Sequence, residues 1–253
     1  MILIIKAAVM LLFSITLNAR EIGETEITTE DGIEVFQNEK FYLLKQNVKI
    51  VSDNFILSAD EVKINFDKSL YDITELDANG NVDFKSNEFE TSGSGNYLNF
   101  KAKVEKIKVE GEGSQLVTSD IKMFSDGFIE VSNLNGDFLL KGKNSKLINE
   151  NIIIEAETIN GNFSKKANEK EITYLEVIDK NISYVKNNDT EMYAKKINFD
   201  YDTSIIELID DAIIIRDEEK ITGDYGTLDT RNNSYKIKSN NQNKVKVIIQ
   251  NNE

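Results

Sequence analysis

The densest group of potential metal ligands lies in the segment DANGNVDFKSNE, residues 77–88. Five oxygen-bearing side chains fall on the first, third, fifth, seventh and twelfth positions of a calcium-loop spacing: Asp77, Asn79, Asn81, Asp83 and Glu88. Such a loop requires glycine at its sixth position, where this chain has Val82, and the flanks alternate like strands rather than helices. The pattern therefore favours a β-turn at Asn79-Gly80 that leads into a strand over 82–84, and we expect no metal site.

Acidic pairs are the other residues that could do chemistry. Three of them have the residue types of a glycosidase acid/base pair: Asp60-Glu61, Asp210-Asp211 and Glu218-Glu219. We place them at strand ends and turns, and the chain has no tryptophan to hold a sugar, so solvated turns are favoured. Histidine and cysteine are absent too, which excludes Ser-His and Cys-His catalysis, disulfides and ordinary zinc sites. We expect no enzyme, no catalytic residue and no cofactor.

The segments around these residues have the pattern of β-strands. In NVKIV, VKINF and NVDFK every second residue is apolar, which places the apolar side chains on one face of a strand. Proline is absent, and clusters of Asn, Asp, Gly and Ser interrupt the runs at short intervals, as hairpin turns do: VSDNF, DANGN, KSNEF, FSDGF, NENI and KNNDT. These features predict an almost purely antiparallel all-β protein.

The pentapeptide KINFD occurs twice, at 63–67 and at 196–200. Ungapped alignment of the first copy with a segment near the C-terminus matches Ile64 to Leu228, and a third segment matches Leu98 to Ile64 and Phe100 to Phe66. Fainter copies lie between them, which indicates about six two-strand units with a period of roughly 30 to 35 residues. A period in that range predicts stacked units, none of which buries its apolar face alone.

The N-terminal stretch MILIIKAAVMLLFSITLNAR resembles a signal peptide. Lys6 is its single charge before Arg20, the apolar region is short, and small residues precede a possible cleavage site after Ala19. We therefore predict that residues 1–19 are a signal peptide and that residues 20–253 form the exported domain. An uncleaved membrane anchor is the alternative, although a span needs about 20 apolar residues and this stretch is interrupted by polar ones.

The size and net charge of the chain limit the classes of partner that it can bind. The chain has 253 residues, of which 40% are hydrophobic, enough for a substantial core without disulfides. Thirty Lys and Arg residues against 44 Asp and Glu give a formal net charge of −14. A nucleic-acid partner is therefore excluded, because phosphate binding needs a basic surface, and we attribute the acidity mainly to solubility.

Three segments together resemble the OstA-like family, in the LptA/LptC type of lipopolysaccharide transport proteins. They are residues 32–67, residues 73–84 and residues 212–239 with the ending KVKVII. The family pattern of an apolar strand, a "GNV" or its equivalent, a turn and "A-D" before a second apolar strand is matched at four places: Asn47-Val48, Asn81-Val82, Ala59-Asp60 and Gly223-Asp224. The resemblance spans nearly all of residues 20–253, with a weakly matching middle segment, 110–170.

The resemblance implies that residues 20–253 form one open, elongated, taco-shaped antiparallel β-jellyroll. Two jellyroll halves joined in sequence are the alternative. It implies a periplasmic protein that carries or bridges lipopolysaccharide from the inner to the outer membrane, with the acyl chains of lipid A in an apolar groove. It also implies partners among inner- and outer-membrane transport components with related jellyroll domains, and head-to-tail homo-oligomers. Ten residues are expected to line the groove: Ile50, Leu57, Ile64, Phe66, Phe84, Leu98, Phe100, Ile197, Phe199 and Leu228.

Other functions remain open at this point. Alternation predicts a closely packed core as well as it predicts a groove, so a structural or surface β-solenoid, or a β-helical enzyme acting on polysaccharides, is an alternative. An inner-membrane-anchored, LptC-like component is another, and it differs in whether residues 1–19 remain attached. The lysine-rich segments 103–108 and 165–170 are expected to be exposed faces, with contact to headgroup phosphates as the alternative. We expect the anionic headgroup itself to stay largely in solvent.

Overall fold

The computed structural model describes residues 23–69, 72–150, 152–164, 171–217, 219–240 and 244–249. The predicted signal peptide, residues 1–19, lies outside them, as do Lys165 to Lys170 and Glu218. No helix in the described ranges is long and apolar enough to span a membrane. Ten strands are long: β3 (Phe41–Val51), β4 (Phe55–Phe66), β5 (Ile73–Ser86), β6 (Thr91–Lys101), β11 (Asp137–Asn149), β12 (Ile152–Phe163), β13 (Ile172–Asn187), β14 (Thr190–Asp200), β15 (Ile205–Arg216) and β16 (Glu219–Asp229).

The short strands form broken rungs of the same ladder. They are β1 (Glu26–Thr28), β2 (Ile33–Phe36), β7 (Lys106–Glu110), β8 (Ser114–Val117), β9 (Ile121–Ser125), β10 (Phe128–Ser132), β17 (Ser234–Lys238) and β18 (Lys246–Ile249), with the 3-10 turn η1 (Ala102–Val104) before β7. Pairs of them, such as β7 and β8, lie end to end along one neighbouring long strand, here β6. The eight short strands therefore stand for four full-length ones, and the described chain has fourteen rungs, or seven two-strand units where about six were predicted.

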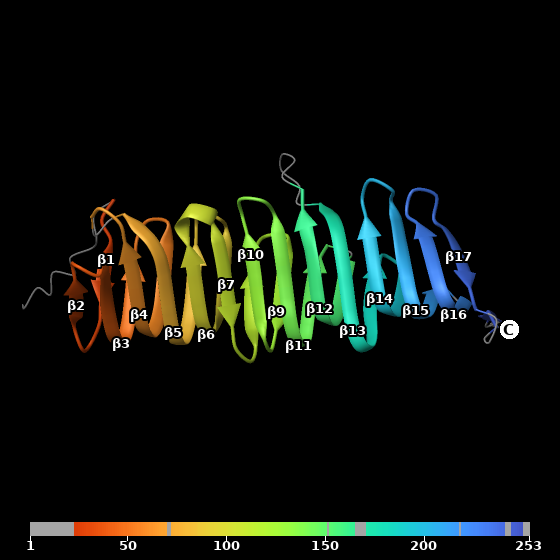
Figure 1. Ribbon diagram of the computed structural model, residues 1–253, viewed down its shortest axis with the longest axis horizontal. Coiled ribbons are helices and arrows are strands. Elements are labelled where there is room, and N and C mark those ends of the chain that lie inside the picture. The colour runs from red at the N-terminus through yellow and green to blue at the C-terminus, as the bar shows by residue number, and fades with distance from the viewer. Residues whose placement is uncertain are drawn as a thin grey trace, which may run out of the picture.

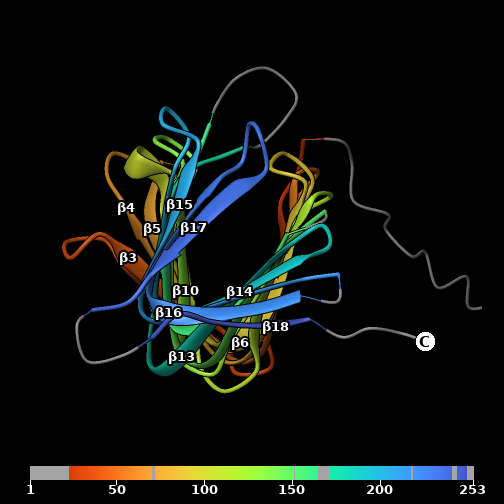
Figure 2. The ribbon, with the colours of Figure 1, turned by 90° about the vertical axis from the view of Figure 1, so that its right-hand side faces the viewer.

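Each long strand bends near its middle, where the pairing register shifts. In β3, residues 41–45 lie beside β4 and β2, whereas residues 48–51 lie beside β4 and β1. The half of the ladder that leads to β2 is called the β2 arm, and the half that leads to β1 is called the β1 arm. At the other end β17 belongs to the β2 arm and β18 to the β1 arm, and Figure 2 shows these two strands on separate walls.

Consecutive rungs pair antiparallel from one end of the molecule to the other, so the chain stacks along its long axis (Figure 1). The fold is the predicted elongated antiparallel β-jellyroll. The middle segment that matched weakly, 110–170, contains the broken rungs β8 and β9/β10. It continues the ladder without a gap in strand pairing.

The bends need polar caps and small inward side chains. Gly80 has φ +73°, and a Cβ atom there would lie 2.2 Å from Oδ2 of Asp60. Asp60 accepts a hydrogen bond from Nδ2 of Asn81 at 2.9 Å, and Asp224 accepts one from the backbone N of Asn240 at 2.6 Å. The "A-D" pairs of the sequence therefore cap bends, because the small residue faces the corner of the core and the aspartate ties the bend to the next rung.

Two predicted turns are corrected by this geometry. We expected a β-turn at Asn79-Gly80, but β5 runs through this dipeptide and bends there instead. FSDGF likewise marks the break between β9 and β10 at the bend. VSDNF, KSNEF, NENI and KNNDT do join consecutive strands, at the tips of the β1 arm.

The core fills the space between the two arms. Its alternate residues are almost fully buried along the whole ladder, with Leu44, Val62, Leu140 and Val177 at 0% exposure. The buried polar residues among the described ones are serines, and two of them, Ser125 and Ser145, lie at the bend with their hydroxyl oxygens 3.0 Å apart. The interior therefore carries no buried charge in the described chain, and its surface is apolar throughout.

Candidate functional site

Between the tips of the two arms, an apolar cleft opens into the interior. Its volume is about 240 Å³. Its apolar lining comes from β12 to β15: Ile152, Ile172, Leu175, Val185, Ile197, Phe199 and Ile206. Its polar rim comes from the strand ends and turns: Asn149, Glu171, Asn187, Tyr201 and Thr230. The cleft therefore belongs to the C-terminal half of the ladder, with an apolar floor and a largely neutral polar entrance.

The two walls of the cleft come from different arms. Ile197 and Phe199 lie in the β2 arm of β14, whereas Ile152 and Val185 lie in the β1 arm of β12 and β13. Ile197 is 1% exposed, but Phe199 is only partly buried because its ring borders the opening. A side chain in this position can contact an incoming apolar ligand without first leaving a sealed core.

The N-terminal half has larger side chains at the matching register positions. In β4 and β5, Phe55 pairs with Ser86 and Leu57 with Phe84. In β12 and β13 the same two pairs are Ile152 with Asn187 and Ile154 with Val185. The rings of Phe55 and Phe84 lie 6.5 Å apart and Phe84 is 2% exposed. Two rings are thus replaced by Ile152 and Val185, and this loss of volume accounts for the cleft.

Hydrogen bonds join the two arms at the C-terminal end of the ladder. Arg216, at the tip of the β1 arm, donates from Nη1 to the carbonyl oxygen of Asn233, in the turn between β16 and β17 of the β2 arm, at 3.3 Å. The hydroxyl of Tyr235 in β17 donates to Glu219 at the start of β16 at 2.9 Å. The hydrogen bond to Glu219 is the main cause that raises the pKa of Tyr235 above its ordinary value. These contacts hold the arm tips together next to the cleft.

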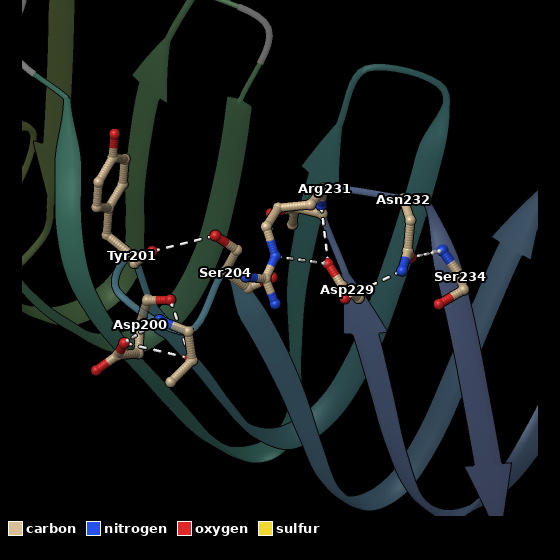
Figure 3. Close-up of polar contacts among 9 residues, drawn as sticks. Asp200, Tyr201, Ser204, Asp229, Arg231, Asn232 and Ser234 are labelled. Atoms are coloured by element: carbon tan, nitrogen blue, oxygen red, sulfur yellow. Dashed lines mark hydrogen bonds and ion pairs between the residues drawn. The ribbon is translucent and has the colours of Figure 1, made fainter.

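The turn that receives Arg216 is itself tightly organised (Figure 3). Asp229 accepts from the backbone N of Arg231 at 2.9 Å and from Nδ2 of Asn232 at 3.2 Å, and Asn232 accepts from the backbone N of Ser234 at 2.9 Å. The hydrogen bond from the Arg231 backbone is the largest cause that lowers the pKa of Asp229. Asp229 is therefore a carboxylate at neutral pH, and it fixes the position of Arg231 in the turn next to the rim residue Thr230.

All ten residues predicted to line a groove face the space between the arms. Eight are at most 9% exposed, and Phe100 and Phe199 are partly buried. Ile197 and Phe199 border the cleft, whereas the other eight lie in the interior or on its rim outside it. Lipid contact by these residues stays a prediction. Sequence reasoning missed Ile152, Ile172 and Val185, although strand alternation marks each as inward-facing.

The candidate metal and acid/base residues do not come together. Asp77 lies in the β2 arm of β5, Asp83 in its β1 arm and Glu88 in the following turn. Asp60-Glu61 and Asp210-Asp211 lie at bends within strands rather than at strand ends. Within the described residues no group of three or more potential ligands could hold a metal ion.

A second hollow, of about 350 Å³, lies on the outer face of the β2 arm over β5 to β7 and β10. Its lysines are paired with acids: Lys106 with Glu130 at 2.6 Å and Lys101 with Glu75 at 3.7 Å. Lys108 likewise pairs with Glu110. The lysine-rich segment 103–108 therefore contributes one ion pair across strands, Lys106–Glu130, and one within β7, Lys108–Glu110, on an outer face where each pair adds little stability.

No model of a protein family matches the chain, and no curated protein matches it. Among solved structures, the chain is similar to LptH from Pseudomonas aeruginosa, described as the LptA-homologous periplasmic component of the lipopolysaccharide transport device. The similarity covers 52% of this chain and 95% of that one, at 14% identity and a TM-score of 0.42. The matched protein thus corresponds in length to about half of this ladder, and the function has to be argued from the cleft and the ends.

Proposed function

We propose that this chain is a periplasmic carrier that binds lipopolysaccharide between its two arms and shields the acyl chains from water. The observation that supports this most strongly is the apolar cleft at the mouth, which leads into an interior without buried charge. Each methylene moved from water into such an environment contributes about 0.8 kcal/mol, so an apolar groove is a sufficient carrier without any chemistry. The sequence resemblance to the OstA-like family supports the same role.

The interior has to widen to take several acyl chains. A cleft of about 240 Å³ is smaller than the roughly 300 to 1,000 Å³ typical of sites for drug-sized ligands. The arms are joined along the bends and by few polar contacts at the tips, so separation of the tips enlarges the groove without breaking the ladder. We expect one chain to enter at the cleft first and the arms to part as further chains follow.

The two ends of the ladder have complementary charge. The segment around β1 and β2 carries acidic residues: Glu24, Glu26, Glu30, Asp31 and Glu34. The segment around β17 and β18 carries basic ones: Lys236, Lys238, Lys244 and Lys246. Stacking β2 of one copy on β17 of the next also continues the antiparallel ladder, because β2 runs from the bend to the tip and β17 from the tip to the bend. Head-to-tail copies, or a related jellyroll domain of a membrane component, fit these ends.

A structural β-solenoid without lipid binding is the second candidate. The sealed packing of the N-terminal half, where Leu57 and Val62 are 0% exposed, favours it. The inner-membrane-anchored alternative depends on residues 1–19, and it differs from the carrier in attachment rather than in the groove.

Native mass spectrometry of the protein purified from a Gram-negative periplasm and titrated with lipid A separates these functions. The carrier is expected to give a saturable one-to-one adduct, and Val185→Phe, which refills the cleft, is expected to weaken it. The outer-face variant Lys220→Gln is the matched control that should bind normally. A folded protein without any adduct would move the assignment to the structural solenoid.

The same spectra test the ends. Concentration-dependent oligomers are expected, and reversing Lys236 and Lys238 to Glu should abolish them. Adding Asp31→Lys and Glu34→Lys, at and before β2, to that variant should restore them, because β2 stacks on β17 and the charges again oppose one another. A strictly monomeric wild-type protein at high concentration contradicts head-to-tail pairing.

A further inference from the structure

Arginine is scarce in this acidic chain, and two of its arginines meet at one turn beside the cleft. The sequence has three arginines, Arg20, Arg216 and Arg231, against 44 acidic residues. Arg216 ends β15 in the β1 arm, and Arg231 lies in the turn between β16 and β17 in the β2 arm. Each therefore lies at the tip of a different arm, and Arg231 directly follows Thr230, which lines the apolar cleft.

The contacts bring the two arginines to one turn. Arg216 reaches the carbonyl oxygen of Asn233 at 3.3 Å, two residues from Arg231. Thr230, the residue before Arg231, lines the cleft and donates its hydroxyl to the carbonyl of Ser204 at 3.1 Å. The turn 230–233 thus carries Arg231, accepts a hydrogen bond from Arg216 and borders the apolar cleft through Thr230.

Two acids beside the arginines, Asp229 and Glu219, are already used as acceptors. Asp229 accepts hydrogen bonds from the backbone N of Arg231, from Nδ2 of Asn232 and, at 3.4 Å, from Nε of Arg231. Because Arg231 uses only Nε of its guanidinium group in the described part of the chain, its two terminal nitrogens are available to a ligand. Glu219 accepts from Tyr235. Among the described residues Arg216 forms no ion pair, and the cleft's own acid, Glu171, lies at the start of the strand β13 rather than in this turn. The turn can therefore accept an anion.

We propose that Arg216 and Arg231 bind the phosphate group of a phosphorylated acyl lipid whose acyl chain occupies the cleft. This inference rests on the proposed function and names the headgroup contacts of the same site. Guanidinium groups suit phosphate because their planar donors match its oxygens in pairs. Binding replaces the weak hydrogen bond from Arg216 to Asn233 by stronger charged ones, so the headgroup and the separation of the arm tips are coupled.

The test compares two single-chain lipids with the same acyl group, oleoyl lysophosphatidate and mono-oleoylglycerol, by isothermal titration calorimetry on the whole protein. The wild type is expected to bind the phosphorylated lipid about tenfold more tightly at low salt. The double variant Arg216→Gln/Arg231→Gln should lose this preference and bind the two lipids with equal affinity. The control Lys49→Gln/Lys85→Gln removes the same charge from exposed positions in the N-terminal half and should keep the preference.

Each other outcome has a distinct meaning. Equal affinity for both lipids in the wild type, or loss of the preference in the control, overturns the arginine site and leaves the carrier function standing. Failure of both lipids to bind contradicts the carrier function itself. Inorganic phosphate is the third probe: displacement of the lipid by phosphate at comparable concentration would make this a site for free phosphate and overturn the lipid proposal.

Discussion

The two copies of KINFD have the same sequence and opposite surroundings. In the first copy Phe66 is 9% exposed and packs near Tyr42, with ring centroids 6.2 Å apart. In the second copy Phe199 is partly buried and borders the cleft. Ile64 and Ile197, two residues earlier, are both 1% exposed. The pentapeptide therefore sets strand direction and inward facing, and it does not set whether the site is open.

The difference comes from the opposite wall. Phe55 and Phe84 in the β1 arm fill the N-terminal half, whereas the matching positions hold Ile152 and Val185 in the C-terminal half. The next rungs also lack rings there, with Thr190 and Ile214 in those positions. In this ladder the cleft thus coincides with the absence of aromatic rings among the described residues of the wall that faces it.

The largest expected effect is a difference in stability between the same substitution at Phe66 and at Phe199. Phe66→Glu should lower the free energy of unfolding by about 4 kcal/mol, because it buries an unpaired charge and removes a packed ring. Phe199→Glu should cost about 1 kcal/mol, since its carboxylate can reach water at the mouth, and should abolish acyl-chain binding. Urea denaturation of both variants checks this. Equal destabilisation would contradict the difference in packing.

Exchanging the wall residues should exchange the properties of the halves. Phe84→Val is expected to cost about 3 kcal/mol through a new cavity, and that cavity should bind a short acyl chain in the N-terminal half. Val185→Phe should change stability by about 1 kcal/mol and should remove the existing cleft. Thermal unfolding and lipid titration measure the two effects, and a Val185→Phe variant with undiminished binding would disprove the role of the wall.

Removing the aspartate at a bend should destabilise both halves equally, because Asp60 and Asp224 each accept a hydrogen bond from the next rung. Asp60→Ala removes the acceptor of Asn81, and Asp224→Ala removes that of Asn240. Each is expected to lower stability by about 0.5 to 1 kcal/mol, as for a single partly solvated hydrogen bond. A large difference between the two in chemical denaturation would mean that the halves differ at the bend as well as at the mouth.

The smallest expected effect is on the alkaline pH dependence of stability, through Tyr235. The hydrogen bond to Glu219 raises the pKa of Tyr235 above its ordinary value of 10.0. The folded state therefore holds this proton more tightly than the unfolded state, and stability falls as pH rises from 10 through the raised pKa. Tyr235→Phe should remove this part of the decline in pH-dependent unfolding. An unchanged slope would mean that the contact between the arms does not persist in solution.

Much of the fold could be predicted from the sequence. Strict alternation around Ile64 and Leu98 and the recurrence of "A-D" before the inward strands indicate a repeating antiparallel ladder. Asn79-Gly80 was misassigned, because turn-forming residues mark sharp bends within a strand as well as hairpins, and local composition does not separate the two.

The site could be predicted only in part. Periodicity marks Phe199 as inward but gives Phe66 the same assignment, because exposure depends on the side chains of the opposite arm. The meeting of Arg216 with the turn at Asn233 depends on the bend angle and on the stacking of rungs, which no local pattern encodes. Alignment of the rungs by register makes the loss of rings at Ile152 and Val185 visible.

Whether acyl chains enter through the cleft of the C-terminal half can be tested directly, because the chain contains no tryptophan. Phe199→Trp and Phe66→Trp each introduce a single fluorescent reporter, and an acyl lipid brominated along its chain quenches tryptophan on contact. We expect strong saturable quenching at position 199 at lipid concentrations that leave position 66 unquenched. Equal quenching at both positions, or quenching at position 66 first, would contradict the claim that acyl chains enter through the cleft of the C-terminal half.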